Sequence, residues 1–210
     1  MLTTRTFLQR LSLSLAAPAA FSGCSSLGLN EPLWTPRALT KPGEFTPGIE
    51  GPACDRAGNI YAVNFAKQQT IGKTTPDGRS EIFVTLPGKS TGNGIVFDRA
   101  GFMYVADYVE HNVLRVDMKK KAVSIFAHEP QMNQPNDLAI APDGTLFASD
   151  PNWKDGTGQL WRIDRNGKTT RLASGMGTTN GIEVSPDGTK LYVNESCLLY
   201  TSPSPRDVEE

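Results

Sequence analysis

The sequence predicts an all-β protein, specifically a β-propeller, from three observations. An apolar stretch, an Asp and Gly turn and a second apolar stretch recur four times, at residues 50–65, 93–108, 136–151 and 180–196. The turn glycines are spaced 43, 43 and 44 residues apart, at Gly58, Gly101, Gly144 and Gly188. No segment beyond the N-terminal region shows a sustained helical period. A sandwich also contains many short strands, but the constant repeat favours propeller blades.

A second kind of hairpin lies between these segments, at residues 71–84, 113–127 and 159–173. The sequences Pro76-Asp77-Gly78 and Arg165-Asn166-Gly167 are strong turn signals within two of them. Each period therefore contains four short strands, which is the content of one blade. We expect the strands that follow the turn glycines to be innermost, at residues 59–64, 102–107, 145–150 and 190–195.

The repeat occupies residues 45–196 and amounts to about three and a half periods. Propellers close with about four to eight blades, so we expect the natural protein to continue beyond residue 210. The pattern stops after Ser196, and the sequence CLLYTSPSPRD (197–207) resembles a translated sequencing adapter. We interpret residues 197–210 as a non-native tail; the alternative is a polar C-terminus of the protein itself.

Residues 1–24 have the layout of a secretory signal peptide. Arg5 and Arg10 bracket a basic start, and the apolar run at 11–21 is too short to span a bilayer. The small residues before Cys24 resemble a bacterial lipobox, in which the cysteine is acylated. We therefore expect an exported, periplasmic protein with a lipid anchor at Cys24 and a linker at 25–44. Plain cleavage and a retained anchor are the alternatives.

Overall charge and cysteine content exclude several classes of function. The net charge of −1 provides no field that would attract nucleic acid. The three cysteines, Cys24, Cys54 and Cys197, form neither a disulfide framework nor a zinc motif.

One polar position recurs in all four repeats, eight residues before each turn glycine. We call its members the entry residues: Glu50, Asn93, Asn136 and Asn180. Because equivalent positions of a propeller are related by rotation, their side-chain oxygens should converge on the axis, within about 6 Å of one another. One carboxylate with amide oxygens suits a divalent cation, Ca²⁺ best, with Mg²⁺, Mn²⁺ or Zn²⁺ as alternatives. Alternatively, each Asn bonds only its own backbone.

The motifs EGP (50–52), PND (135–137) and NGIEVSPDGTKLYVNES (180–196) resemble the blade-opening motifs of the SMP-30/gluconolactonase/regucalcin family. The resemblance implies a six-bladed propeller that binds one divalent cation and hydrolyses sugar lactones or related small cyclic esters. It implies that Glu50 and Asn180 bind the metal. It also implies that Asn136 and Asn93 lie on the substrate side of the site.

Two departures from the family pattern affect this interpretation. The family's third protein ligand and general base is an aspartate that opens the fifth blade, which this sequence does not reach. Gln134 stands where some members carry a sugar-binding arginine. Within the chain, Asp137 is the catalytic candidate, and we expect these 210 residues alone to be inactive. The alternative function is a non-catalytic exported propeller that binds a ligand or serves as an assembly scaffold.

Overall fold

The computed structural model describes residues 36–196. The chain divides into two units, Met1–Arg37 and Ala38–Glu210, and the fold described below is that of the second unit. The predicted signal peptide (1–24) and the predicted tail (197–210) lie outside the described residues.

Between residues 36 and 196 the structure consists of strands and turns, and it contains no helix that could cross a membrane. The strands are β1 (Ala53–Cys54), β2 (Ile60–Val63), β3 (Thr70–Thr74), β4 (Ser80–Thr85), β5 (Gly92–Phe97), β6 (Met103–Asp107), β7 (Asn112–Asp117), β8 (Ala122–His128), β9 (Leu138–Ile140), β10 (Leu146–Asp150), β11 (Gln159–Ile163), β12 (Thr169–Ala173), β13 (Thr179–Val184) and β14 (Leu191–Glu195).

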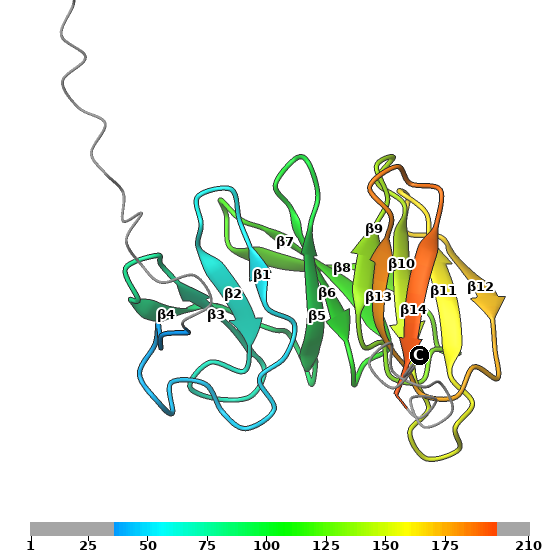
Figure 1. Cartoon of the computed structure of the whole chain (residues 1–210), viewed down its shortest axis with the longest axis horizontal. Helices are drawn as coiled ribbons and strands as arrows, with labels where there is room; N and C mark the ends of the chain where they lie inside the picture. The colour runs from blue at the N-terminus through cyan, green and yellow to red at the C-terminus, as the bar shows by residue number, and fades with distance from the viewer. Residues whose placement is uncertain (1–35, 197–210) are drawn as a thin grey trace, which may run out of the picture. The chain divides into compact units, whose positions relative to one another are not determined.

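These strands form four antiparallel sheets in which each strand pairs with its neighbour in sequence. Three sheets have the order β1-β2-β3-β4, β5-β6-β7-β8 and β9-β10-β11-β12, and the fourth contains β13 and β14 (Figure 1). The predicted outer hairpins are the pairs β3/β4, β7/β8 and β11/β12. The prediction of propeller blades is therefore confirmed.

The prediction of which strands are innermost was wrong. Strands β2, β6 and β10, which follow the turn glycines, are each hydrogen-bonded on both sides and so cannot be edge strands. The sheets approach one another through the strands before the turns, with β9 lying against both β5 and β13. Strands β6 and β10 are buried because both of their faces are covered by neighbouring sheets.

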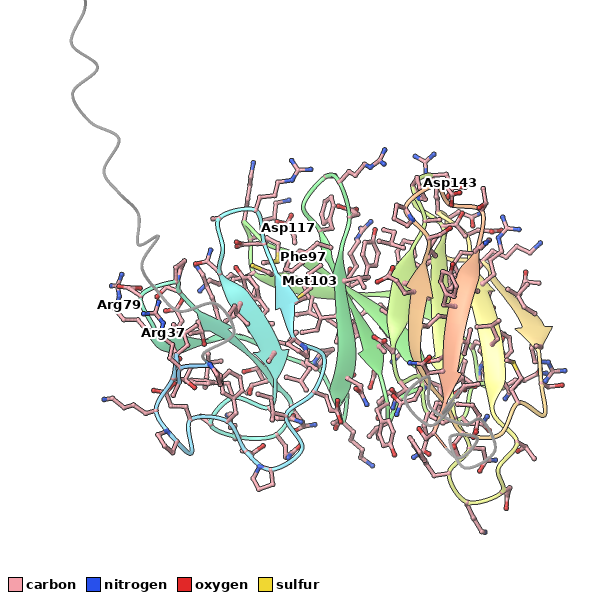
Figure 2. The ribbon with its side chains drawn as sticks, in the orientation of Figure 1. Arg37, Arg79, Phe97, Met103, Asp117 and Asp143 are labelled. Atoms are coloured by element: carbon pink, nitrogen blue, oxygen red, sulfur yellow. The ribbon has the colours of Figure 1, made fainter. Side chains whose placement is uncertain are left out.

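The core consists of apolar layers between adjacent sheets. Along β6, Met103 and Val105 pack toward the first sheet, whereas Tyr104 and Ala106 pack toward the third. This alternation is the period of two that a strand imposes on its side chains. Figure 2 shows Met103 together with Phe97 in the layer between the first and second sheets. The second and third sheets are thus covered on both faces, and the first and fourth are each covered on the face that meets a neighbouring sheet.

The four repeated turns lie at one end of the sheets, and the turn between β13 and β14 is at the top of Figure 1. Their glycines have positive φ angles between 71° and 89°, a region that favours glycine. The aspartate of each turn accepts hydrogen bonds from nearby backbone amides; Asp143, for example, accepts one from Thr145 at 2.9 Å. The turns thus direct the chain out of each edge strand and into its neighbour.

The end of the predicted linker contacts the first sheet. The Ser80 hydroxyl donates to the Glu44 carboxylate at 2.7 Å, and the Ala66 amide donates to the Glu44 carbonyl at 2.8 Å. Phe45 forms an isolated antiparallel bridge with Phe65. The compact unit therefore includes residues from Ala38 onward, seven positions earlier than the repeat alone indicated.

Candidate functional site

The four entry residues lie at the end of the sheets opposite the repeated turns. Asn93 and Asn180 are second in β5 and β13, and Glu50 and Asn136 lie just before β1 and β9. These strands are the inner edges of their sheets, so the entry residues occupy equivalent places in four adjacent blades. The structure thus places all four where the chain enters the inner strand.

Contacts between neighbouring sheets connect these places in one row. In the first sheet, Gly51 packs so closely on the carbonyl oxygen of Asn93 that a side chain there would overlap it. In the second, the Gly94 amide donates to the carbonyl of Asn136 at 2.7 Å. The row is therefore continuous from the first blade to the third.

Asp137 extends the row from the third blade to the fourth. Its Oδ2 accepts a hydrogen bond from the Ile182 amide at 3.2 Å, and its Oδ1 accepts one from Leu138 at 2.9 Å. Burial raises the pKa of Asp137, these two amides oppose the rise, and the negative charge of Glu183 adds to it. The corresponding residue of the other repeats is glycine, so the third blade alone has a carboxylate here.

Two of the entry residues lie in β-bulges. Asn93 and Gly94 fall in a register shift of β5, where they face the single residue Ala106 of β6. Asn180 and Gly181 occupy the same kind of shift in β13. A bulge leaves one residue outside the regular ladder and redirects its side chain. The repeated Asn-Gly sequence is the signal that could have predicted these bulges.

The entry side chains differ in their access to solvent. Glu50 is exposed, whereas Asn136 is only 8% exposed. Asn180 donates from Nδ2 to the Ser196 hydroxyl at 3.1 Å, a bond that uses the amide nitrogen and not the oxygen that a cation would require. Glu50 accepts a hydrogen bond from the Val63 amide through its backbone carbonyl at 3.2 Å, which leaves its carboxylate out of the ladder.

These residues fit a hard cation through the chemistry of their donors. One exposed carboxylate and several amide oxygens are ligands that Ca²⁺ accepts. Among residues 36–196, no group of three or more His, Cys, Asp or Glu side chains is arranged to hold a metal ion. A site at the entry residues would therefore depend on the asparagine oxygens. Convergence of the four oxygens within about 6 Å stays a prediction.

Sequence reasoning missed a second polar position that recurs at the end of each strand after the turn. We call its members the strand-end residues: Asn64, Asp107, Asp150 and Glu195. Asp107 and Asp150 are completely buried. The signal was present in the repeat, because the first three lie six residues after their turn glycines and Glu195 lies seven after Gly188.

The comparisons with known proteins identify the family and the fold. Residues 41–200 match the family described as the SMP-30/Gluconolactonase/LRE-like region. A gluconolactonase of Zymomonas mobilis is 25% identical over 172 residues, which cover 70% of this chain and 48% of the relative. The chain thus spans about half the length of that curated relative.

Solved structures have the same fold. A gluconolactonase of Xanthomonas campestris matches with a TM-score of 0.61 and 20% identity, over 70% of this chain and 54% of its own. Regucalcin of Agrobacterium tumefaciens, a calcium-binding protein, matches with a TM-score of 0.58 and 23% identity, over 70% of this chain and 50% of its own. The family match covers most of the chain, and the chain therefore belongs to the SMP-30/gluconolactonase/LRE-like family.

Proposed function

We propose that the complete protein is a hydrolase of the gluconolactonase type that opens sugar lactones or related small cyclic esters with the help of a divalent cation. The observation that carries this proposal is the continuous row of oxygen-bearing entry residues along the inner strands. Membership of the family supports the reaction class. The calcium-binding regucalcin among the structural neighbours supports Ca²⁺ as the cation.

In this proposal Glu50 and Asn180 hold the cation, and Glu50 contributes the negative charge. A bound cation would act as a Lewis acid on the lactone carbonyl. Asn136 and Asn93 orient the lactone through their amide groups, which can donate and accept hydrogen bonds. The two residues lie on adjacent blades that are joined by the backbone hydrogen bond from Gly94 to Asn136, and this bond would hold their side-chain amides next to each other.

Asp137 is the candidate within this chain for taking the proton from the attacking water. An ionised carboxylate offers about four lone-pair sites, and backbone amides of Leu138 and Ile182 use two of them. Burial raises the pKa of Asp137, which brings it closer to the range in which general bases work.

A comparison of variants in the complete protein tests the proposal. Hydrolysis of glucono-lactone should be lost on treatment with a chelator and should return when Ca²⁺ is added. Glu50→Gln should weaken cation binding and hydrolysis together. Glu81→Gln is the matched control, because Glu81 is an exposed glutamate on β4, outside the row. Hydrolysis that is indifferent both to chelator and to Glu50→Gln would refute the metal-dependent part of the proposal.

We also propose that the protein is exported to the periplasm and anchored through Cys24. The support is the sequence of residues 1–24 alone. Mass spectrometry of the N-terminal peptide from the native host should find an acylated Cys24. An unmodified peptide that spans Gly23 and Cys24 would contradict this.

A further inference from the structure

In each blade the strand-end residue binds the loop that leads to the entry residue of the same blade. The bond always involves the backbone two positions before the entry residue. Its members are Asn64 Nδ2 to the Gly48 carbonyl at 3.0 Å, the Thr91 amide to Asp107 Oδ1 at 3.1 Å, the Gln134 amide to Asp150 Oδ1 at 2.6 Å and the Thr178 amide to Glu195 Oε1 at 2.6 Å.

Further bonds strengthen this attachment in the two complete central blades. The Ser90 hydroxyl donates to Asp107 at 2.6 Å, and the Asn133 amide donates to Asp150 at 2.8 Å. Hydrogen bonds to a carboxylate are about twice as strong as those between neutral groups. Burial of an ionised group without partners is very costly, so these carboxylates are tied to the loops that satisfy them.

The second strand of a blade is a firm support for such a loop. Strands β6 and β10 are hydrogen-bonded on both sides, and Asp107 and Asp150 are their last residues. The loops before β5 and β9 cross from one sheet to the next and have few backbone bonds to their own blade, such as that from the Tyr108 amide to the Thr91 carbonyl at 2.9 Å. The carboxylates therefore transfer the rigidity of the central strands to the loops that carry the entry residues.

We propose that Asn64, Asp107, Asp150 and Glu195 are positioning residues that hold the four entry residues in place for ligand binding. The identity of the ligand rests on the proposed function, whereas the attachment of the loops does not. A residue with a purely structural role would lower stability when replaced and leave the ligand affinity of the folded protein unchanged. The two roles can therefore be separated by experiment.

Hydrogen exchange tests the attachment without any ligand. Asp150→Asn preserves the volume of the side chain but removes its charge and part of its capacity to accept. Trp161→Phe is the control, because the Trp161 indole donates to the same carboxylate at 3.0 Å from outside the loop. In the complete protein, amides of residues 132–137 should exchange about tenfold faster in Asp150→Asn than in Trp161→Phe. Equal exchange in the two variants would overturn the proposal.

Ligand binding tests the consequence for the site. Asp150→Asn should raise the KM for glucono-lactone, and Glu195→Ala should raise the Ca²⁺ dissociation constant measured by calorimetry. Each change should be about 10- to 100-fold, the usual effect of removing a group that orients a ligand-binding residue. Glu195→Gln keeps one acceptor oxygen but loses the charge, so its dissociation constant should lie between those of Glu195→Ala and the unaltered protein. Trp161→Phe should lower the melting temperature but leave both constants unchanged.

The outcomes distinguish this inference from the proposed function. If Asp150→Asn and Glu195→Ala lower the melting temperature but change neither constant, as Trp161→Phe does, the positioning role is refuted. The proposed lactone hydrolysis would still stand. If the unaltered protein neither binds Ca²⁺ nor hydrolyses lactones, the proposed function is refuted. The exchange measurement then decides by itself whether the strand-end residues hold the loops.

Discussion

Replacement of Gly94 by alanine tests the close approach of the second and third sheets at the candidate site. An added Cβ would lie 2.7 Å from the Cα of Asp137 and 2.9 Å from the carbonyl oxygen of Asn136. Both are backbone atoms, so no side-chain rotation can relieve the overlap. The Gly94 amide donates to that same carbonyl at 2.7 Å, so any movement apart would also lengthen this hydrogen bond.

The expected loss of stability follows from these two effects. Overpacking in a closely packed region costs about 1–3 kcal/mol, and a weakened hydrogen bond costs about 1 kcal/mol more. Gly94→Ala should therefore lower the free energy of unfolding by about 2–4 kcal/mol. The matched control is Gly181→Ala in the fourth blade, where the nearest atom to a new Cβ is the Asn194 side-chain nitrogen at 3.4 Å. Its effect should be within about 0.5 kcal/mol.

Urea unfolding followed by far-ultraviolet circular dichroism provides the measurement. The midpoint for Gly94→Ala should fall while the slope with denaturant stays constant, because a clash in the folded state changes stability and not the surface exposed on unfolding. Gly181→Ala should unfold close to the unaltered protein. A Gly94→Ala variant as stable as the unaltered protein, or equal losses in both variants, would refute the packing between the two blades.

Three further predictions concern charge and core packing. Burial raises the pKa of Asp150 in the folded protein. The stability that its protonated form contributes is therefore full below the unfolded pKa of about 4 and is lost as the pH rises through the folded pKa. From pH 4 to 7, the melting temperature of Asp150→Asn should rise relative to that of the unaltered protein, and parallel curves would contradict this. The hydrogen bond from the Thr145 amide lowers the pKa of Asp143. The stability that the ionised carboxylate contributes is therefore present above about pH 4 and is lost as the pH falls through the lowered pKa. Asp143→Asn should melt below the unaltered protein at neutral pH, and this difference should shrink on acidification; a constant difference would count against the bond in the turn. Leu114→Ala, at a fully buried position, should cost about 2–5 kcal/mol in chemical denaturation, whereas Ile125→Ala, at a side chain 60% exposed, should cost less than about 0.5 kcal/mol; similar losses would refute the assigned core.

The location of the candidate site could be predicted because the repeat identifies equivalent positions in successive blades. A constant offset of eight residues from each turn glycine selects Glu50, Asn93, Asn136 and Asn180, and the fold places all four at the entrance to an inner strand. A second constant offset, six residues after the turn glycine, would have identified Asp107 and Asp150. It could not reveal that they bind the backbone amides of Thr91 and Gln134, because those bonds depend on how the chain folds back between one blade and the next.

The sequence by itself determined the blade, its turns and its number of strands, because these depend on local chemistry. Gly58 and its equivalents permit a positive φ, and alternating apolar residues form strands that cannot be exposed on both faces. Only the tertiary structure decided which strand lies at the inner edge. The apolar sequence of β6 indicates that the strand is buried between two sheets. It does not indicate how far the strand lies from the propeller axis, because inner and central strands are buried in the same way. The tertiary structure likewise decided the contact of Gly94 with Asp137, since it depends on how one blade stacks on the next.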